Sequence, residues 1–421
     1  MNRGAEDKFA RVAALKPARR REPIEERPQG AGAADFDPLA QFVGATVGRN
    51  RYGEHLVVRR WYSTPAECPP TPHALRLLLP ERDGAHAAAC DPAEWLFLDT
   101  ETTGLAGGTG TYAFLVGLAW WDAGGLQVEQ FFMRDHGEEH SLLLELSRRL
   151  AERRVLVTFN GKSFDWPLLE TRFRMTRAIA PRAPVAHLDL LHPARQLWRL
   201  RLGSVRLTEL ERHVLGERLD WTRADDIDSA LIPQLYFDYL RGGQPEPLAG
   251  VFRHNQMDLR GLAALAGRIL RLLAEPEADT GDGLELYGLS RLLHRCGDAR
   301  AQRLYEHALD AGLPHTLDRA ARHELALLAK RQRDYARATH LWQELARDAA
   351  ASLEACEQLA IHYEHRARDP LRAAEFTRRA LDALGRSLLV PGPSGKLRAR
   401  LEHRLARLER KAKLAARPIP L

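Results

Sequence analysis

The spacing of hydrophobic and polar residues changes at a polar, glycine-containing stretch at 275–283. Before this stretch the chain carries short apolar runs such as WLFLD at 95–99 and VLVTFN at 155–160. Runs of this length are typical of strands buried inside a sheet. Two further runs, AFLVGLAWW at 113–121 and LQVEQFFM at 126–133, are separated by Asp-Ala-Gly-Gly, which favours a hairpin turn.

Helical patterns stand between and after these runs. EEHSLLLELSRRLAERR and FDWPLLETRFRM have apolar residues at helical spacing, HLDLL at 187–191 is a further strand, and a long final helix runs to about Leu273. The order is three consecutive strands, a helix, a strand, a helix, a strand and then helices. This order predicts an α/β fold: an antiparallel meander extended by parallel strands, with helices on both faces of the mixed sheet.

Beyond residue 283 the sequence is helical and repeats itself. RCGDARAQRLYEHAL, RQRDYARATHLWQEL and RARDPLRAAEFTRRAL place Asp298, Asp334 and Asp369 at intervals of 36 and 35 residues. Each aspartate precedes an amphipathic helix and follows another helical segment. Helix–turn–helix units with a period of about 34 residues are similar to a tetratricopeptide array, and such arrays usually bind partner proteins or a neighbouring domain.

Composition excludes several classes of protein. A chain of 421 residues with 45% hydrophobic and 28% charged residues can hold two or three domains. No apolar run is long enough to span a bilayer, and the N-terminus lacks the apolar segment of a secretory signal. The four cysteines, Cys68, Cys90, Cys296 and Cys356, are scattered, which disfavours a disulfide framework. These features predict a cytoplasmic protein without a membrane segment.

The positive charge of the chain is concentrated at its C-terminus. Residues 396–421 contain nine Lys or Arg and two Glu, a net charge of +7 against +6 for the whole chain, which leaves −1 for residues 1–395. A basic tail can bind a polyphosphate partner. The alternative is a solvated amphipathic helix over LRARLEHRLARLERKAKLAAR. A second basic cluster, Arg195, Trp198, Arg199 and Arg201, either lines a channel for a nucleic-acid strand or forms an ordinary helix surface.

Acidic residues follow two of the predicted strands. Asp99 and Glu101 close WLFLDTE, and residues i and i+2 of a strand point to the same face. Two carboxylates held close together repel each other unless a cation neutralises them. Mg²⁺ and Mn²⁺ prefer such oxygen ligands. The segment FNGKSFD delivers Asp165 to the carboxyl edge of the sheet, with Asn160 and Phe164 beside it. Each segment taken alone also fits a structural role.

A third group lies in the long helix near its middle. Asp258 falls within an apolar stripe of this helix, and His254 lies one turn earlier at the edge of the stripe. A buried acid needs a positive partner, and a histidine beside it can accept a proton near neutral pH. A satisfied pair in the core is the alternative. Asp189 of HLDLL is expected to be structural.

Taken together, these pieces match a known pattern. Asp-Thr-Glu-Thr-Thr-Gly, Asn-x3-Phe-Asp and His-x3-Asp, in this order, resemble the three motifs of the DEDD (DnaQ-like) 3′–5′ exonucleases in the ribonuclease H-like superfamily. DTETTGLAGGTGTYAFLVGL, DLLHPARQLW and IPQLYFDYLRGG ahead of HNQMDL are most similar to the YprB-like branch, and the resemblance covers roughly residues 40–275. One departure is the last motif, because the family pairs His with x4 or Tyr with x3. The departure concerns His254 and leaves the implied role of Asp258 unchanged.

The resemblance implies hydrolysis of single-stranded DNA or RNA from its 3′ end to nucleoside 5′-monophosphates, by a two-metal mechanism. Two Mg²⁺ or Mn²⁺ ions bind to Asp99, Glu101, Asp165 and Asp258, and His254 takes the proton of the attacking water. The resemblance also implies substrate-binding roles for Thr102, Leu105, Asn160, Lys162 and Phe164.

We therefore expect a disordered segment at 1–38, a ribonuclease H-like exonuclease domain at 39–274, tetratricopeptide-like repeats at 284–385 and a basic tail at 386–421. A protein partner of the repeats is part of this hypothesis. Two alternatives remain open. One is a non-catalytic nucleic-acid-binding scaffold whose repeats recruit proteins, and the other is an endonuclease on the same fold.

Overall fold

The structure is a computed structural model, and it describes most of the chain from residue 37 onward. Leu105 and all but the last two residues of the segment 1–38 lie outside the described residues. The described ranges are 37–63, 74, 77–79, 91–104, 109–177, 179, 184–216, 219, 221–278, 281–348, 352–387 and 394–415.

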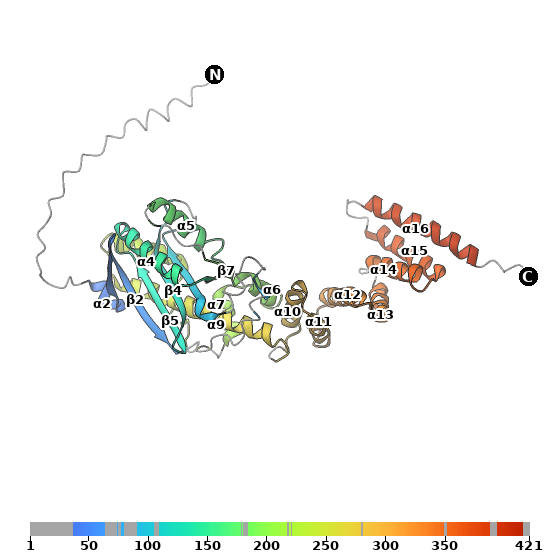
Figure 1. Cartoon of the computed structure of the whole chain (residues 1–421), viewed down its shortest axis with the longest axis horizontal. Coiled ribbons are helices and arrows are strands. Elements are labelled where there is room, and N and C mark those ends of the chain that lie inside the picture. The colour runs from blue at the N-terminus through green and yellow to red at the C-terminus, as the bar shows by residue number, and fades with distance from the viewer. Residues whose placement is uncertain are drawn as a thin grey trace, which may run out of the picture. The chain divides into compact units, whose positions relative to one another are not determined.

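The described strands form one seven-stranded sheet in the order β1-β2-β5-β4-β3-β6-β7 (Figure 1). Strand β3 pairs antiparallel with β4 and parallel with β6, and β6 continues parallel to β7. The predicted meander with its parallel extension is therefore confirmed. The strands are β1 (Thr46–Asn50), β2 (Gly53–Tyr62), β3 (Trp95–Thr102), β4 (Ala113–Asp122), β5 (Gly125–Phe132), β6 (Val155–Thr158) and β7 (Ala186–Asp189).

The predicted hairpin joins β4 to β5. Strand β4 ends at Asp122 and β5 begins at Gly125. The two residues between them, Ala123 and Gly124, have φ angles of 49° and 79°. Two successive positive φ angles match the right-handed twist of the flanking strands, which is why this turn follows the hairpin signal in the sequence.

Helices cover both faces of the sheet, as the sequence pattern predicted. Leu96 of β3 shares a buried core with Leu146 and Leu169 from two of the helices. Its neighbour Phe97 points the opposite way and shares a second core with Leu197 and further helices. The helices of this region are α2 (Pro38–Val43), α4 (Glu139–Glu152), α5 (Asp165–Thr176), α6 (Leu191–Leu202), α7 (Leu207–Leu210), α8 (Ile232–Leu240) and α9 (Glu246–Ala274), with short helical turns η2 (Pro92–Glu94), η3 (His136–Glu138), η4 (Glu211–Leu215) and η6 (Ser229–Leu231).

Helix α9 lies very close to strand β4 because β4 carries a glycine there. A Cβ atom added at Gly117 would overlap the Oδ1 atom of Asn255 and the side chain of Leu259. Gly117 is also the residue of β4 that pairs with Asp99 of β3. The missing side chain therefore lets α9 approach the sheet directly beside the first acidic motif.

The C-terminal region is entirely helical within its described residues. Asp334 accepts a hydrogen bond from the backbone N–H of Arg337, and Asp369 accepts one from Arg372, both at 3.0 Å. The repeated aspartates thus cap the second helix of each pair, a role that explains their spacing. That the region is a tetratricopeptide array stays a prediction. Its helices are α10 (Gly283–Arg295), α11 (Ala301–Asp310), α12 (His315–Arg331), α13 (Tyr335–Arg347), α14 (Ser352–His365), α15 (Pro370–Ser387) and α16 (Ser394–Ala415).

The basic C-terminal residues form helix α16, the amphipathic alternative for this segment. Leu401 and Leu408, seven residues apart, are buried. On the same helix Arg407 and Lys411 approach the carboxylate of Glu364 at 2.8 Å and 3.2 Å. Part of the positive charge is therefore neutralised within the chain. Among the described residues, every helix is too short or too polar to cross a membrane.

The close approach of α9 to β4 makes a prediction about stability. Gly117→Ala is expected to lower the free energy of unfolding by about 1–3 kcal/mol, because the added methyl group meets Asn255 and Leu259. Urea denaturation followed by circular dichroism measures the change. Gly110→Ala is the control, because a Cβ there has no neighbour within 4 Å. Equal stability of the two variants would contradict the argument.

Candidate active site

Three elements place the predicted acids near the end of strand β3, without the spacing of an assembled metal site. Asp99 and Glu101 are on β3, Asp165 is the first residue of α5, and Asp258 lies in α9. Strand β3 is tied to α5 because the hydroxyl of Thr100 donates to Asp165 Oδ1 at 2.5 Å. It is also tied to α9, because Asn255 Nδ2 donates to Asp99 Oδ2 at 2.7 Å.

The charges of these acids act on one another. Burial raises the pKa of Asp99 well above its ordinary value, and the negative charges of Asp258 and Asp165 raise it further. Burial also raises the pKa of Glu101, as do the charges of Asp99 and Asp258. Residues that are far apart in the sequence therefore repel each other at close range, which is the condition that a cation would relieve.

Asp165 shows the same behaviour in a milder form. Burial raises its pKa from 3.8 to about 6, although the hydrogen bond from Thr100 lowers it in part. The nearby charge of Asp189 contributes to the increase. A carboxyl group with this pKa is close to half protonated in mildly acidic solution.

His254 is held by a residue that sequence reasoning did not select. Its Nδ1 atom lies 2.8 Å from Asp226 Oδ1, while its Nε2 atom lies 3.6 Å from Asp258 Oδ2. When Nδ1–H donates to Asp226, Nε2 is left as the acceptor on the side of the acids. The His-x3-Asp spacing thus places both side chains on one face of α9, one turn apart.

A buried arginine balances part of the negative charge. Arg223 donates to Asp258 Oδ1 at 2.5 Å, to Glu211 at 2.5 Å and to Asp226 at 2.8 Å. Burial lowers the pKa of Arg223, but the hydrogen bond to Glu211 and the charge of Asp258 outweigh this effect, so the pKa is raised. Arg223 is therefore fixed as a cation against the acid of α9.

A chain of amides fixes the orientation of Asp99. Gln130 of β5 donates to Asn255 Oδ1 at 2.8 Å, and Gln256 donates to Gln130 Oε1 at 2.7 Å. The hydroxyl of Tyr62 completes the chain by donating to Gln256 Oε1 at 2.9 Å. Because its Oδ1 already accepts from Gln130, Asn255 presents its NH₂ group to Asp99.

The loop before α5 carries three of the predicted substrate-binding residues. Asn160 adopts a φ of 67°, and its backbone N–H donates to Asp189 Oδ1 at 2.7 Å. The backbone N–H of Lys162 donates to the other oxygen of Asp189 at 3.1 Å. Asp189 therefore shapes this loop, in agreement with its expected structural role. The side chain of Lys162 is exposed.

The remaining predicted substrate residues differ in what they can contact. Phe164 directly precedes Asp165 and is 58% exposed, so its ring is free to stack on a base. Thr102 donates its hydroxyl to the backbone oxygen of Gly104 at 3.1 Å, which shapes the end of β3. Leu105 lies outside the described residues.

The donor set fits a hard divalent cation. Four carboxylates with no cysteine among them suit Mg²⁺ or Mn²⁺. Within the described ranges, no three Asp, Glu, His or Cys side chains stand at the spacing of an assembled metal site. Arg223 and Asn255 hold oxygens of Asp258 and Asp99 in this arrangement. Ion binding therefore requires these carboxylates to turn toward one another.

Comparison with known proteins identifies the domain that carries these acids. A family description, the RNase H superfamily, matches residues 96–270, which span all four acids. The chain is also 32% identical over 320 residues to the "Uncharacterized protein YprB" of Bacillus subtilis (strain 168), covering 75% of this chain and 74% of YprB. The chain belongs to the RNase H superfamily. Members of the RNase H superfamily usually hydrolyse phosphodiester bonds and generally use divalent metal ions.

Three important residues of this superfamily member were not selected from its sequence. Asn255 lies between the two predicted residues of the last motif, and nothing in its type marks it as a partner of Asp99. Arg223 and Asp226 lie in an irregular segment before α8. The acidic run ADDID at 224–228 marks this segment in the sequence. That Asp226 of this run contacts His254, however, depends on the tertiary fold.

The raised pKa of Asp165 gives a pH-dependent prediction. A carboxyl with a raised folded-state pKa adds stability that is complete below about pH 3.8 and is lost as the pH rises through about 6. In EDTA, Asp165→Asn should therefore gain stability relative to wild type as the pH increases over this window. Urea unfolding at several pH values measures this difference. A constant difference between the two proteins would contradict the assignment.

Proposed function

We propose that this protein is a metal-dependent 3′–5′ exonuclease that acts on single-stranded DNA or RNA. The observation that carries the proposal is the placement of half-buried carboxylates from β3, α5 and α9 near one another, where their like charges repel, with His254 beside Asp258. A protein does not hold like charges together without a compensating partner, and a pair of divalent cations supplies one. Membership of the RNase H superfamily supports hydrolysis as the reaction.

Each of the chain's own residues has a defined task in this proposal. Asp99, Glu101, Asp165 and Asp258 hold the two ions. Bound Mg²⁺ or Mn²⁺ supplies a water of lowered pKa and neutralises charge on the phosphate.

His254 accepts the proton of the attacking water at Nε2, and Asp226 holds the ring in the required orientation at 2.8 Å. Phe164 stacks on a base near the 3′ end of the strand, and Asn160 and Lys162 position its backbone. Thr102 and Leu105 complete the proposed substrate contacts.

A labelled-strand assay tests the proposed activity. Wild-type protein with Mg²⁺ or Mn²⁺ is expected to shorten 5′-labelled single strands step by step from the 3′ end. Asp99→Asn should lower the rate by at least about 100-fold, because one ligand charge is lost at the reacting centre. Asp122→Asn, at the exposed end of β4, is the matched control and should retain wild-type activity. Intact wild-type substrate under all metal conditions would refute the proposal.

The pairing of His254 with Asp226 makes a separate prediction. Asp226→Asn is expected to lower the rate by about 10–100-fold, because the ring loses its charged partner. It should leave strand affinity unchanged, and the pH profile of the rate should shift. The control is Asp225→Asn, the exposed neighbour in the same segment. Equal pH profiles for the two variants would remove Asp226 from the mechanism.

A circular single strand separates the proposal from its two alternatives. An exonuclease needs a free end and leaves the circle intact, whereas an endonuclease on the same fold linearises it. A non-catalytic scaffold binds linear and circular strands without cutting either, with or without metal. Running DNA and RNA versions in parallel identifies the preferred substrate.

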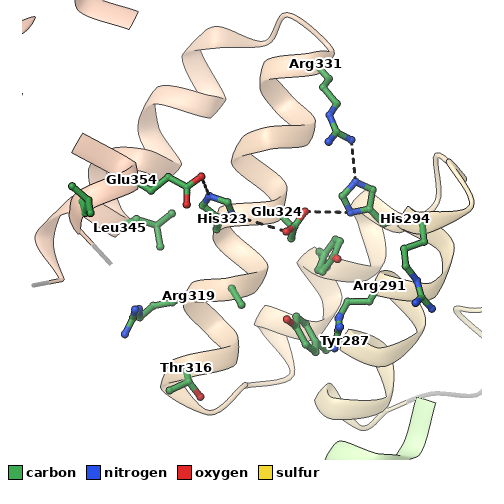
Figure 2. A pocket seen from close by; sticks show the side chains of 14 residues that line it. Tyr287, Arg291, His294, Thr316, Arg319, His323, Glu324, Arg331, Leu345 and Glu354 are labelled. Atoms are coloured by element: carbon green, nitrogen blue, oxygen red, sulfur yellow. Dashed lines mark hydrogen bonds and ion pairs between the residues drawn. The ribbon is translucent and has the colours of Figure 1, made fainter. Parts of the chain in front are cut away.

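For the C-terminal helices we propose a protein-binding role. A cavity of about 800 Å³ lies in this region, and Figure 2 shows the side chains that line it. His294 lies 3.4 Å from Glu324 and His323 lies 3.0 Å from Glu354 across it. This cavity lies in helices α10 to α14, so it is not part of the acidic site.

A further inference from the structure

A second cavity begins at the loop that leads to Asp165 and continues along helix α6. Its volume is about 480 Å³, within the range of small-ligand sites. We call it the α6 cavity. Its charged lining consists of Arg195 and Arg199 from α6 and Arg206 from the following turn. Phe159 and Asn160 line its other side, and within the described residues no Asp or Glu contributes to its lining.

The three arginines are exposed and unpaired, whereas a neighbour on the same helix is engaged. None of the three side chains has an acidic partner among the described residues. Arg201, by contrast, lies 3.0 Å from Glu285 of α10. Trp198 is fully buried and belongs to the core. The structure therefore divides the basic cluster of α6: Arg201 and Trp198 hold the fold, while Arg195 and Arg199 remain available, together with Arg206 of the following turn.

Three like charges around one cavity repel each other and are tolerated where an anion joins them. The cavity of the C-terminal helices shows the other arrangement, in which acids already lie beside the basic groups (Figure 2). Guanidinium groups bind phosphate oxygens by two parallel hydrogen bonds, and exposed arginines do so with little desolvation cost. The chemistry of the α6 cavity is that of a phosphate site.

One carboxylate ties the α6 cavity to the acidic site. Asp189 accepts from Asn160 N at 2.7 Å and from Leu191 N, in the first turn of α6, at 3.1 Å. The same loop continues through Phe164 to Asp165. The start of α6 and the loop that delivers Asp165 are therefore fixed relative to each other. The α6 cavity is therefore lined by the same loop that delivers Asp165.

We propose that the α6 cavity binds the sugar-phosphate backbone of the single strand on which the acidic site acts. This inference rests on the proposed function for the identity of the strand. Arg195, Arg199 and Arg206 contact successive phosphates behind the 3′ end. Because these contacts go to the backbone, they carry no base preference.

Strand binding without metal tests this assignment apart from catalysis. A fluorescent single strand of about 12 nucleotides is titrated in EDTA over a range of NaCl concentrations. For Arg195→Gln/Arg199→Gln/Arg206→Gln the affinity should fall by at least about 10-fold. The slope of log affinity against log salt should decrease by about 2, since each phosphate contact on a single strand contributes about 0.7.

Two control proteins distinguish a specific site from a general loss of charge. Arg51→Gln/Arg148→Gln/Arg174→Gln removes the same charge from exposed arginines outside α6 and should keep the wild-type slope. Arg195→Lys/Arg199→Lys/Arg206→Lys keeps the charge and should recover most of the slope, which also rules out misfolding as the cause.

Each outcome decides between the two proposals. An unchanged slope in the cavity variant, an equal loss in the distant control, or a wild-type protein that binds no strand overturns the cavity assignment. If wild type binds through these arginines but cleaves nothing with Mg²⁺ or Mn²⁺, the proposed activity fails and the strand site stands. If wild type cleaves while the cavity variant binds normally, the activity stands and the strand site fails.

Discussion

The repulsion between half-buried carboxylates near the end of β3 is the constraint on which the rest of the site depends. Burial raises the pKa of Asp99, Glu101 and Asp165, so the folded chain holds these acids at a cost in free energy. The surrounding fold offsets part of it through hydrogen bonds from Asn255 and Thr100. The arrangement opposes stability, which is why it supports the proposal of a cation site here.

Rigid supports keep this strained group of acids in place. The glycine at position 117 lets α9 lie against the sheet, and the amide chain from Tyr62 to Asn255 then fixes the orientation of Asp99. Asp189 plays a similar part on the other side, since it holds both the loop before α5 and the start of α6. In the proposed function, the acids that hold cations and the arginines that contact phosphates thus lie on neighbouring segments, the charge separation that a phosphodiester substrate requires.

The distribution of positive charge along the sequence does not show which basic side chains are unpaired in the folded protein. The positive charge of the sequence is concentrated in its last 26 residues, which left open a polyphosphate-binding tail or a solvated amphipathic helix. In helix α16, however, Arg407 and Lys411 are engaged by Glu364 of α14. The exposed arginines of the α6 cavity, which have no acidic partner among the described residues, lie in a part of the chain whose overall charge is close to neutral. Local pairing, rather than net charge, identifies the basic surface that can bind a ligand.

The sequence alone predicted strands β3 to β7, their order along the chain and the four candidate acids, because each depends on local pattern. Short apolar runs, the turn at Asp-Ala-Gly-Gly and the aspartates that cap helices all act over a few residues. Only the tertiary structure decided which side chains meet. Asn255 reaches Asp99, Asp226 reaches His254 and Arg223 reaches Asp258 across separations of 156, 28 and 35 residues. Such contacts depend on the position of α9 on the sheet, and this position cannot be predicted from local periodicity.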